Sequence, residues 1–282
     1  MEPVFCYITW DANPEIFSIG NFSLRWYSLM FLLGFLIGYQ IMKKFFENEG
    51  KPTEWLDTLL LYLMIGTIFG ARIGHCVFYD WEYFSQHLLE IILPVRFEPE
   101  FKFIGYRGLA SHGGAIGIIF MMWLFSKRVT KTSMLWILDR VVIPIALTGM
   151  FIRLGNLMNS EILGNPTDVA WGFIFKKDTE FGDTPVHPVQ LYESICYLGI
   201  FVFMFWQYWK TNAKDKLGFL FGTFLVLLWS VRFILEYFKR SQGGIESVFG
   251  NALSTGQLLS IPFVLIGVYF IVRKVPNNKV KL

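Results

Sequence analysis

The dominant pattern along the chain is a series of long apolar stretches separated by polar connections. A helix needs about 20 apolar residues to cross a bilayer, and about seven stretches approach that length. They lie near 24–45, 55–78, 109–126, 134–152, 189–209, 217–237 and 253–273. The chain is therefore predicted to be an all-α polytopic membrane protein, with residues 1–282 forming a single integral membrane domain.

The connections differ in lysine and arginine content, which predicts their orientation because cytoplasmic loops usually carry an excess of these residues. The first, third, fifth and last stretches are each followed by basic residues: Lys43, Lys44, Lys51, Lys127, Arg128, Lys131, Lys210, Lys214, Lys216, Arg273, Lys274, Lys279 and Lys281. The C-terminus is then expected to be cytoplasmic. The N-terminus and the connections 79–108, 153–188 and 238–252 are expected to face outward.

The two longer outward connections are predicted to form a small extracytoplasmic domain. Within 79–108, the segment from Gln86 to Val95 carries an apolar run too short to span a bilayer. Such a segment is typical of an amphipathic arm lying at the membrane interface.

Composition agrees with the membrane class. The hydrophobic fraction is 54%, only 17% of residues are charged, and the mean hydropathy is +0.46. No basic stripe indicates a nucleic-acid partner. Cys6, Cys76 and Cys196 lie far apart without the spacing of a zinc site or a disulfide framework, so unpaired thiols are expected.

Unusual polar residues fall at the ends of the stretches that are predicted to face outward. They are Tyr27, Arg72, His75, His112, Arg153, Gly155, Asn156, Asn159, Glu161, His187, Gln190, Tyr192, Glu193, Arg232, Glu236 and Gln257, where Gly155 is counted with its polar neighbours. Loop charge and polar clustering thus indicate the same side of the membrane. The sequence predicts a site in the outer half of the bilayer.

The run from Phe151 to Glu161 is the strongest single signal. Arg153, Asn156 and Glu161 follow the predicted end of the fourth stretch, and a charge at membrane depth costs about 2.5–3.5 kcal/mol unless it faces protein or water. The alternative is a structured loop in which Arg153 pairs with Glu161. Two amides, a cation and a carboxylate within so short a run exceed what a turn requires, which favours a site.

The other polar residues each have a structural alternative. Arg232 and Glu236 could form an intrahelical pair four residues apart, and His112 could be a hydrogen-bonded packing residue. The segment from His187 to Glu193 could simply begin a helix. Gly66, Gly70 and Gly74 are most simply a close helix contact.

Two arginines, a histidine and carboxylates on one side of a membrane predict an anion site beside a candidate base. A phosphate ester suits it, since guanidinium binds phosphate oxygens through paired, charge-assisted hydrogen bonds. No phosphate-binding glycine loop, zinc motif or serine-hydrolase elbow is present. We therefore expect chemistry without a metal or cofactor.

The motifs resemble those of the bacterial phosphatidylglycerol:prolipoprotein diacylglyceryl transferases, in family order from the first stretch to the last. Ser160 stands where the family commonly has glycine. The matching segments are Arg25-Trp-Tyr27, Gly70-Ala-Arg72, Ser111-His-Gly-Gly114, Arg153-Leu-Gly-Asn156-Leu-Met-Asn159-Ser-Glu161, His187-Pro-Val-Gln-Leu-Tyr-Glu193, Arg232-Phe-Ile-Leu-Glu236 and Gly256-Gln257.

The resemblance implies transfer of the sn-1,2-diacylglyceryl group from phosphatidylglycerol to the lipobox cysteine of a prolipoprotein signal peptide, with release of glycerol 1-phosphate. This is the first step of lipoprotein maturation, and it implies a location in the bacterial inner membrane. A catalytic set is expected: His112 as the candidate base, with Arg153, Arg232, Glu161 and Glu236. Alternatively, a site lined with arginines could lower the pKa of the cysteine thiol without a dedicated base. A substrate-binding set is also expected: Tyr27, Arg72, Gly155, Asn156, Asn159, His187, Gln190, Tyr192 and Glu193.

Two other functions fit a helical bundle that contains arginines. An anion transporter would more often show repeated halves with paired interrupted helices, which this sequence lacks. A purely structural or receptor protein accounts for the apolar stretches but not for the clustering of polar residues on one side.

Overall fold

The computed structural model describes residues 7–20, 22–93, 95–97, 101–103, 105, 110–180, 182–240 and 253–273. The chain forms two compact units. The first contains residues 1–42 and 138–282, and the second contains residues 43–137. The predicted loop 238–252 and the C-terminal tail fall mostly outside the described residues.

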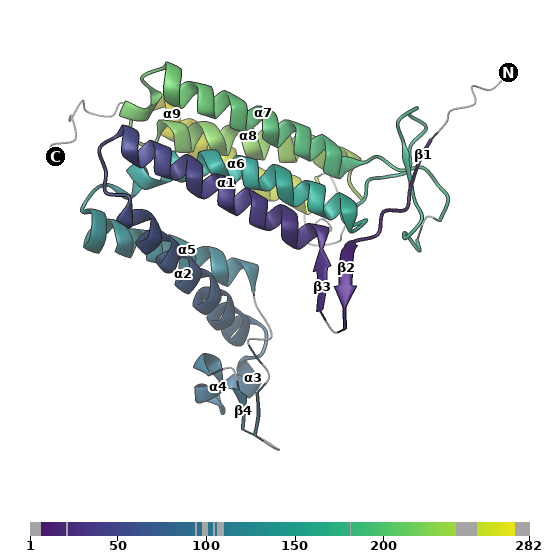
Figure 1. The fold of residues 1–282 in the computed structure, drawn as a ribbon, viewed down its shortest axis with the longest axis horizontal. Helices are drawn as coiled ribbons and strands as arrows, with labels where there is room; N and C mark the ends of the chain where they lie inside the picture. The colour runs from purple at the N-terminus through teal and green to yellow at the C-terminus, as the bar shows by residue number, and fades with distance from the viewer. Residues whose placement is uncertain are drawn as a thin grey trace. The chain divides into compact units, whose positions relative to one another are not determined.

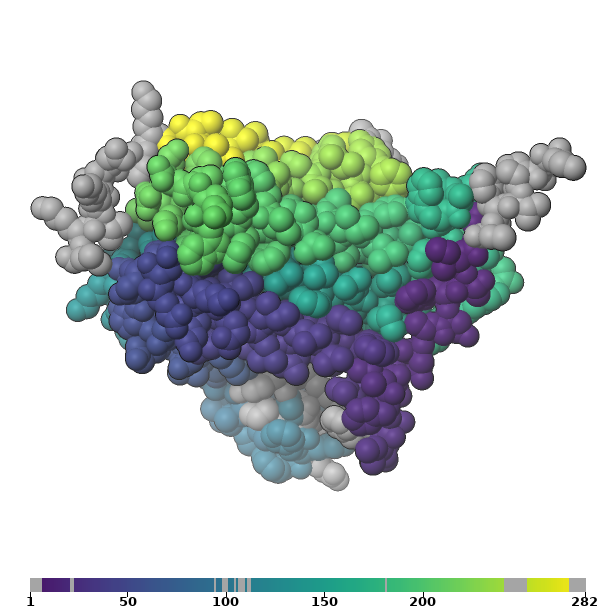
Figure 2. Space-filling model, turned by 45° about the horizontal axis from the view of Figure 1, so that its top comes forward, coloured from purple at the N-terminus to yellow at the C-terminus, as the bar shows by residue number. Residues whose placement is uncertain are grey.

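Six helices in the described part of the chain are long and apolar enough to cross a membrane. They are α1 (Trp26–Asn48), α2 (Glu54–Phe78), α6 (Met134–Met158), α7 (Val189–Lys210), α8 (Phe219–Leu235, extended by a 3-10 turn over Glu236–Phe238) and α9 (Thr255–Val272). Large apolar side chains of α7 remain exposed, including Ile195 (67%) and Trp206 (53%), and Figure 2 shows the uncovered side of this helix in green. The prediction of an all-α polytopic membrane protein is confirmed.

The predicted stretch 109–126 differs from the other six. Its helix α5 covers only Ser111–Phe125, 15 residues, and continues as a π-helical turn over Ser126–Thr130. Together the two elements form 20 consecutive helical residues, about the number that a membrane-spanning helix needs. Six helices among the described residues thus meet the length requirement singly, and the seventh predicted stretch forms the continuous helix over residues 111–130.

In the second unit, α2 and α5 pack closely through glycines. A Cβ built on Gly70 would lie 2.5 Å from the carbonyl oxygen of Gly113, and one on Gly66 would lie 2.8 Å from that of Gly117. Only glycine permits this approach of two helix backbones. The predicted close helix contact at Gly66, Gly70 and Gly74 is confirmed.

In the first unit, α7 packs on α8 and α8 packs on α9 (Figure 1). The helix α6 passes close to α1, because a Cβ on Gly34 would lie 3.1 Å from Thr148 and one on Gly38 would lie 3.2 Å from Pro144. Pro144 cannot donate a backbone hydrogen bond. The Thr148 hydroxyl donates to the Pro144 carbonyl oxygen at 2.9 Å.

The polar end of α6 corrects the predicted helix boundary. The helix continues to Met158 rather than ending at 152, so that Arg153, Gly155 and Asn156 lie on its last two turns. The helix stops where Ser160 and Ile162 adopt positive φ values of 55° and 57°. Helical geometry therefore sets the spacing of the first part of the polar run.

The connection after α6 folds with the N-terminal segment into a small strand-containing region. Strand β1 (Ile8–Trp10) pairs in parallel with β6 (Phe173–Phe175). The β2 (Glu15–Ile19) and β3 (Phe22–Arg25) strands form an antiparallel hairpin that leads into α1. A compact apolar cluster includes two residues of β6: Leu157, Leu163, Phe173, Phe175 and Val186. These short strands were not predicted.

The connection 79–108 in the second unit contains the short helices α3 (Trp81–Phe84) and α4 (Leu88–Ile92), followed by strands β4 (Val95–Arg96) and β5 (Lys102–Phe103). On α4, Leu88, Leu89 and Ile92 are 58–65% exposed, whereas Glu90 is buried. Burial raises the pKa of Glu90, but hydrogen bonds from Phe97 N–H and Tyr83 O–H, together with the charges of His87 and Arg96, hold that pKa below its ordinary value. Apolar side chains outward and the carboxylate inward suit the predicted interfacial arm.

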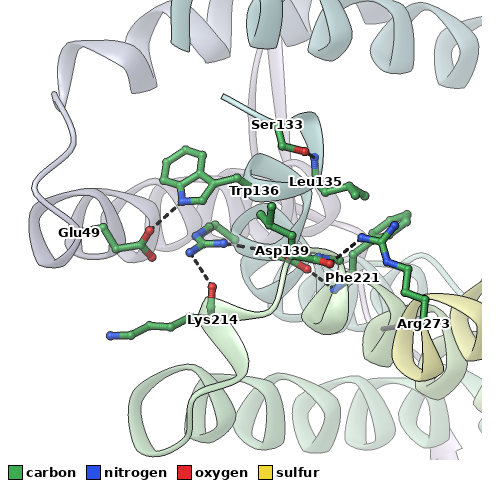
Figure 3. A network of polar contacts seen from close by, with 11 residues as sticks. Glu49, Ser133, Leu135, Trp136, Asp139, Lys214, Phe221 and Arg273 are labelled. Carbon is green, nitrogen blue, oxygen red and sulfur yellow. Dashed lines mark hydrogen bonds and ion pairs between the residues drawn. The ribbon is translucent and has the colours of Figure 1, made fainter. Parts of the chain in front are cut away.

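The opposite end of α6 carries Asp139, which is fully buried in the first unit (Figure 3). Its carboxylate accepts hydrogen bonds from the backbone N–H groups of Gly218 (2.6 Å) and Phe221 (2.8 Å) at the start of α8. Arg140 donates to the Lys214 carbonyl oxygen at 3.0 Å. Asp139 thereby satisfies N–H groups that a helix N-terminus leaves unpaired.

Candidate anion site in the first unit

A buried carboxylate shared by two cations forms the centre of the candidate site. Glu193 Oε2 lies 2.7 Å from Arg153 Nε, and Glu193 Oε1 lies 2.7 Å from Lys239 Nζ. The Glu193 side chain is fully buried, while those of Arg153 and Lys239 remain 13% and 10% exposed. Two cations thus share one buried carboxylate in a site of limited solvent access.

Three separate segments bring these groups together. Arg153 lies near the end of α6, Glu193 is the fifth residue of α7, and Lys239 follows the 3-10 turn after α8. Lys239 is held in place by a β-bridge to Gly164. The site is therefore built where the ends of α6, α7 and α8 meet.

The Glu161 carboxylate accepts hydrogen bonds from two side-chain amides, and no ion pair joins it to Arg153 among the described residues. The Asn156 and Asn159 side-chain amides donate to its two carboxylate oxygens at 3.0 and 3.1 Å. Arg153 reaches this group only through Asn156, since its Nη1 donates to Asn156 Oδ1 at 3.2 Å. The alternative in which Arg153 pairs with Glu161 is not found among the described residues, because the helical turn aims Arg153 toward Glu193 of α7.

The amide of Gln190 fixes the same loop from α7. Its Nε2 donates to the Glu161 backbone carbonyl oxygen at 2.6 Å, and the side chain is fully buried. Asn156, Asn159, Gln190 and Glu193 thus belong to one connected network with Arg153. With Glu161, the structure brings six predicted site residues together through these contacts.

Arg232 and Glu236 do not form the considered intrahelical pair. The α-helix ends at Leu235, and the Glu236 N–H still donates to the Arg232 carbonyl oxygen, but no ion pair joins the two side chains among the described residues. Glu236 lies 3.8 Å from Lys239 instead. The Arg232 guanidinium carbon lies 5.2 Å from the centre of the Trp229 ring, and its buried Nε has no hydrogen-bond partner among the described residues.

Tyr27 and Gly155 are in direct contact. A Cβ built on Gly155 would lie 2.9 Å from Tyr27 Cδ2 and 3.1 Å from its Cα. Glycine therefore lets the start of α1 approach the last turns of α6. Gly155 acts on the site by making room for Tyr27.

His187 belongs to an aromatic cluster next to the start of α7. Its Nδ1 lies 3.2 Å from the Tyr192 hydroxyl, which accepts a hydrogen bond from Trp171 Nε1 at 2.8 Å. The ring packs edge-on against Phe238 at 5.0 Å. Partial burial lowers the pKa of His187 below its ordinary value, which favours the neutral ring.

The two remaining predicted residues belong to the second unit. Arg72 is 2% exposed, and its guanidinium donates to the Glu90 carbonyl oxygen at 2.6 Å and to that of Ile91 at 3.3 Å. These hydrogen bonds attach Arg72 of α2 to the backbone of α4. His112 is the second residue of α5, and its side chain lies outside the described part of the structure.

Sequence reasoning missed Lys239 and Gly164. Lys239 follows Arg232 by seven residues, just beyond an apolar stretch, in a segment that was predicted only as a polar loop. Gly164 has no room for a side chain, since a Cβ there would lie 2.4 Å from the His187 carbonyl oxygen and 2.8 Å from that of Phe238. The available signal for Lys239 was its position just after the helix that carries Arg232. No sequence signal pointed to Gly164.

Comparison with known proteins gives a consistent result. The family model described as "Prolipoprotein diacylglyceryl transferase" matches residues 14–273. A protein of Tolumonas auensis named phosphatidylglycerol–prolipoprotein diacylglyceryl transferase is 47% identical over 260 residues, covering 92% of this chain and 94% of its own. Proteins of the same name from Chloroherpeton thalassium (45% over 277 residues; 98% and 97% covered) and Porphyromonas gingivalis (44% over 284 residues; 96% of each covered) are also similar. The chain belongs to the prolipoprotein diacylglyceryl transferase family.

Proposed function

We propose that this protein transfers the sn-1,2-diacylglyceryl group of phosphatidylglycerol to the cysteine thiol of a prolipoprotein, as the first step of lipoprotein maturation. Membership of the family supports the reaction, and the helices long enough to span a bilayer support access to a lipid substrate. The observation that carries the proposal is the buried Glu193 carboxylate held between Arg153 and Lys239.

The reaction forms a thioether and releases a phosphate monoester. The cysteine sulfur forms a bond to the sn-3 carbon of the diacylglyceryl group, and the bond from that carbon to the phosphate oxygen breaks. Its electron pair leaves with glycerol 1-phosphate, while the thiol proton passes to a base. Negative charge therefore grows on the leaving phosphate, and fixed cations nearby lower the barrier.

Arg153, Arg232 and Lys239 are the proposed phosphate ligands. Arg153 and Lys239 already share one carboxylate, and a phosphate oxygen is an equivalent acceptor for their N–H groups. Arg232 has a buried Nε without a partner among the described residues, which leaves that group ready for an anion. Glu193, Asn156 and Glu161 are proposed to orient these cations, and Tyr27 and Asn159 are proposed to bind substrate.

His112 is the proposed general base. A thiol has an ordinary pKa near 8.5, so little thiolate exists at neutral pH without a base or a cationic environment. Imidazole is suited to accept a proton in this pH range. His187, whose pKa is lowered by burial, is assigned with Tyr192 to substrate binding.

The proposed location is the inner membrane of a bacterium, with the N-terminus outside, the C-terminus in the cytoplasm and the site toward the outer leaflet. Basic residues beyond α1, α7 and α9 support this orientation. The proposed protein substrate is a signal peptide whose lipobox supplies the cysteine. The connections 79–108 and 153–188 would then face the compartment from which that peptide approaches.

Incubation of the purified protein with phosphatidylglycerol and a lipobox peptide, followed by mass spectrometry, tests the proposal. We expect the peptide to gain one diacylglyceryl group on cysteine, with equimolar glycerol phosphate. His112→Gln and Arg232→Ala should sharply reduce the yield, whereas Lys127→Ala, in a predicted cytoplasmic loop, should not. Absence of the adduct with the folded protein would contradict the proposal.

A further inference from the structure

The carboxylate of Glu236 lies directly against Gly256, the second residue of α9. A Cβ built on Gly256 would lie 2.4 Å from both Cδ and Oε1 of Glu236, and 2.7 Å from Oε2. Real Cβ atoms do not approach other atoms so closely, so any side chain at position 256 must displace this carboxylate. The contact joins residues 20 positions apart in the sequence.

The first turn of α9 is firmly built around this contact. The Ser254 hydroxyl accepts from Gln257 N–H at 3.2 Å, and the Gln257 side chain accepts from Ser254 N–H at 3.0 Å, which completes a capping box. The other end of the Gln257 amide donates to the Phe233 carbonyl oxygen of α8 at 3.3 Å. A helix N-terminus favours a nearby anion through its dipole, so the capped turn is a stable surface for the Glu236 carboxylate.

Holding Glu236 at this surface affects the two neighbouring cations. Glu236 Oε2 is 3.8 Å from Lys239, whereas no ion pair joins Glu236 to Arg232 in the described part of the chain. Arg232 lies one helical turn before Glu236, so a carboxylate that was free to move would have the Arg232 guanidinium as an alternative partner. Its attachment to α9 leaves Arg232 for a different anion.

We infer that Gly256 is a positioning residue of the transferase site: its missing side chain seats Glu236 on the first turn of α9 and so keeps Arg232 unpaired for the phosphate. This inference rests on the proposed function. It assigns a physical reason to the Gly256-Gln257 motif, in which Gln257 fixes the turn and Gly256 makes room. Glycine in a helix is otherwise unfavourable relative to alanine.

Gly256→Ala tests this role against Gly199→Ala. Gly199 is a matched helical glycine of α7, where an added Cβ would meet no atom of the described residues within 4 Å. We expect Gly256→Ala to lower kcat/KM for phosphatidylglycerol about tenfold or more, because small displacements in a site have large kinetic effects. Gly199→Ala should stay within about twofold of the parent protein. Adding Glu236→Asp, whose side chain is shorter, to Gly256→Ala should restore about threefold or more of the loss.

A double-mutant cycle keeps the test decisive if Gly256→Ala folds poorly. In a Glu236→Ala background the extra Cβ has space, so Gly256→Ala should then leave the unfolding midpoint unchanged or raise it. Full activity of Gly256→Ala, absence of rescue by Glu236→Asp, or equal destabilisation by Gly256→Ala in both backgrounds would overturn the inference. If the parent protein gives no transfer, the proposed function fails, and the midpoints still decide whether the Gly256–Glu236 contact exists.

Discussion

The two ends of α6 both carry charged side chains with little solvent exposure, but the partners of these side chains differ. At one end, Asp139 and Arg140 are bonded to backbone groups of Gly218, Phe221 and Lys214. At the other, Arg153 is paired with the Glu193 side chain, which is shared with Lys239. Backbone groups of a helix start and its preceding loop cannot leave without local unfolding, whereas a side-chain partner can be exchanged for a ligand. The first arrangement is structural, and the second is suited to binding.

Arg153→Ala should produce the largest effect on function. Removal of one preorganised cation from a site of developing negative charge costs about 10²–10³-fold in rate. The rate of adduct formation by mass spectrometry measures the loss. Arg153→Lys should recover only part of it, because lysine cannot reproduce the planar guanidinium contact, and equal rates for both variants and the parent would contradict the assigned role.

Asp139→Ala should lower the stability of the protein rather than its rate of transfer. Loss of this carboxylate leaves two buried N–H groups unpaired and removes the charge nearest to Arg140, which costs about 3–5 kcal/mol of stability by analogy with broken buried pairs. Thermal unfolding in detergent reports this loss. The rate per folded molecule should stay at the parent value, and a specific loss of transfer at unchanged stability would place Asp139 in the chemistry instead.

Lys239→Ala tests whether the second cation of the site binds the phosphate, by comparison with a lysine outside the site. We expect KM for phosphatidylglycerol to rise about tenfold, the effect of losing one charge-assisted hydrogen bond. Lys214→Ala is the matched control, since its side chain lies over Tyr208 and only its backbone carbonyl serves Arg140. Similar KM values for the two variants would remove Lys239 from the phosphate ligands.

Ser160→Gly should give the smallest effect. Ser160 has a φ of 55°, a region that costs a non-glycine residue about 1 kcal/mol. Glycine should raise stability by up to this amount and leave transfer unchanged, as measured by unfolding midpoint and initial rate. A lower midpoint would show that the Ser160 side chain stabilises the turn after α6.

The sequence was sufficient for the membrane fold and for the residue types of the site. Long apolar runs predict helices directly, and the polar residues that interrupt their ends mark Arg153, Asn156 and Glu193. The three-residue strands β1 and β6 escaped prediction because so short a segment has no detectable alternation. The end of α6 was predicted six residues early because a change from apolar to polar side chains ordinarily indicates the end of a membrane helix.

The sequence could not predict which carboxylate in the site pairs with which cation. Arg153 and Glu161 are near in sequence, yet Arg153 pairs with Glu193, 40 positions away, because the packing of α6 and α7 decides which carboxylate its side chain reaches. The same holds for Glu236, which sequence spacing assigns to Arg232 and which lies against Gly256. Such contacts depend on the three-dimensional placement of helix ends.

The central claim is that the Arg153 end of α6, and not the Asp139 end, binds the phosphate of the lipid. Native mass spectrometry of detergent-purified protein titrated with phosphatidylglycerol measures this directly for the parent, Arg153→Ala and Asp139→Asn. We expect Arg153→Ala to lower the affinity for phosphatidylglycerol about tenfold, with Asp139→Asn binding like the parent. Unchanged binding in Arg153→Ala, or an equal loss in both variants, would contradict the claim.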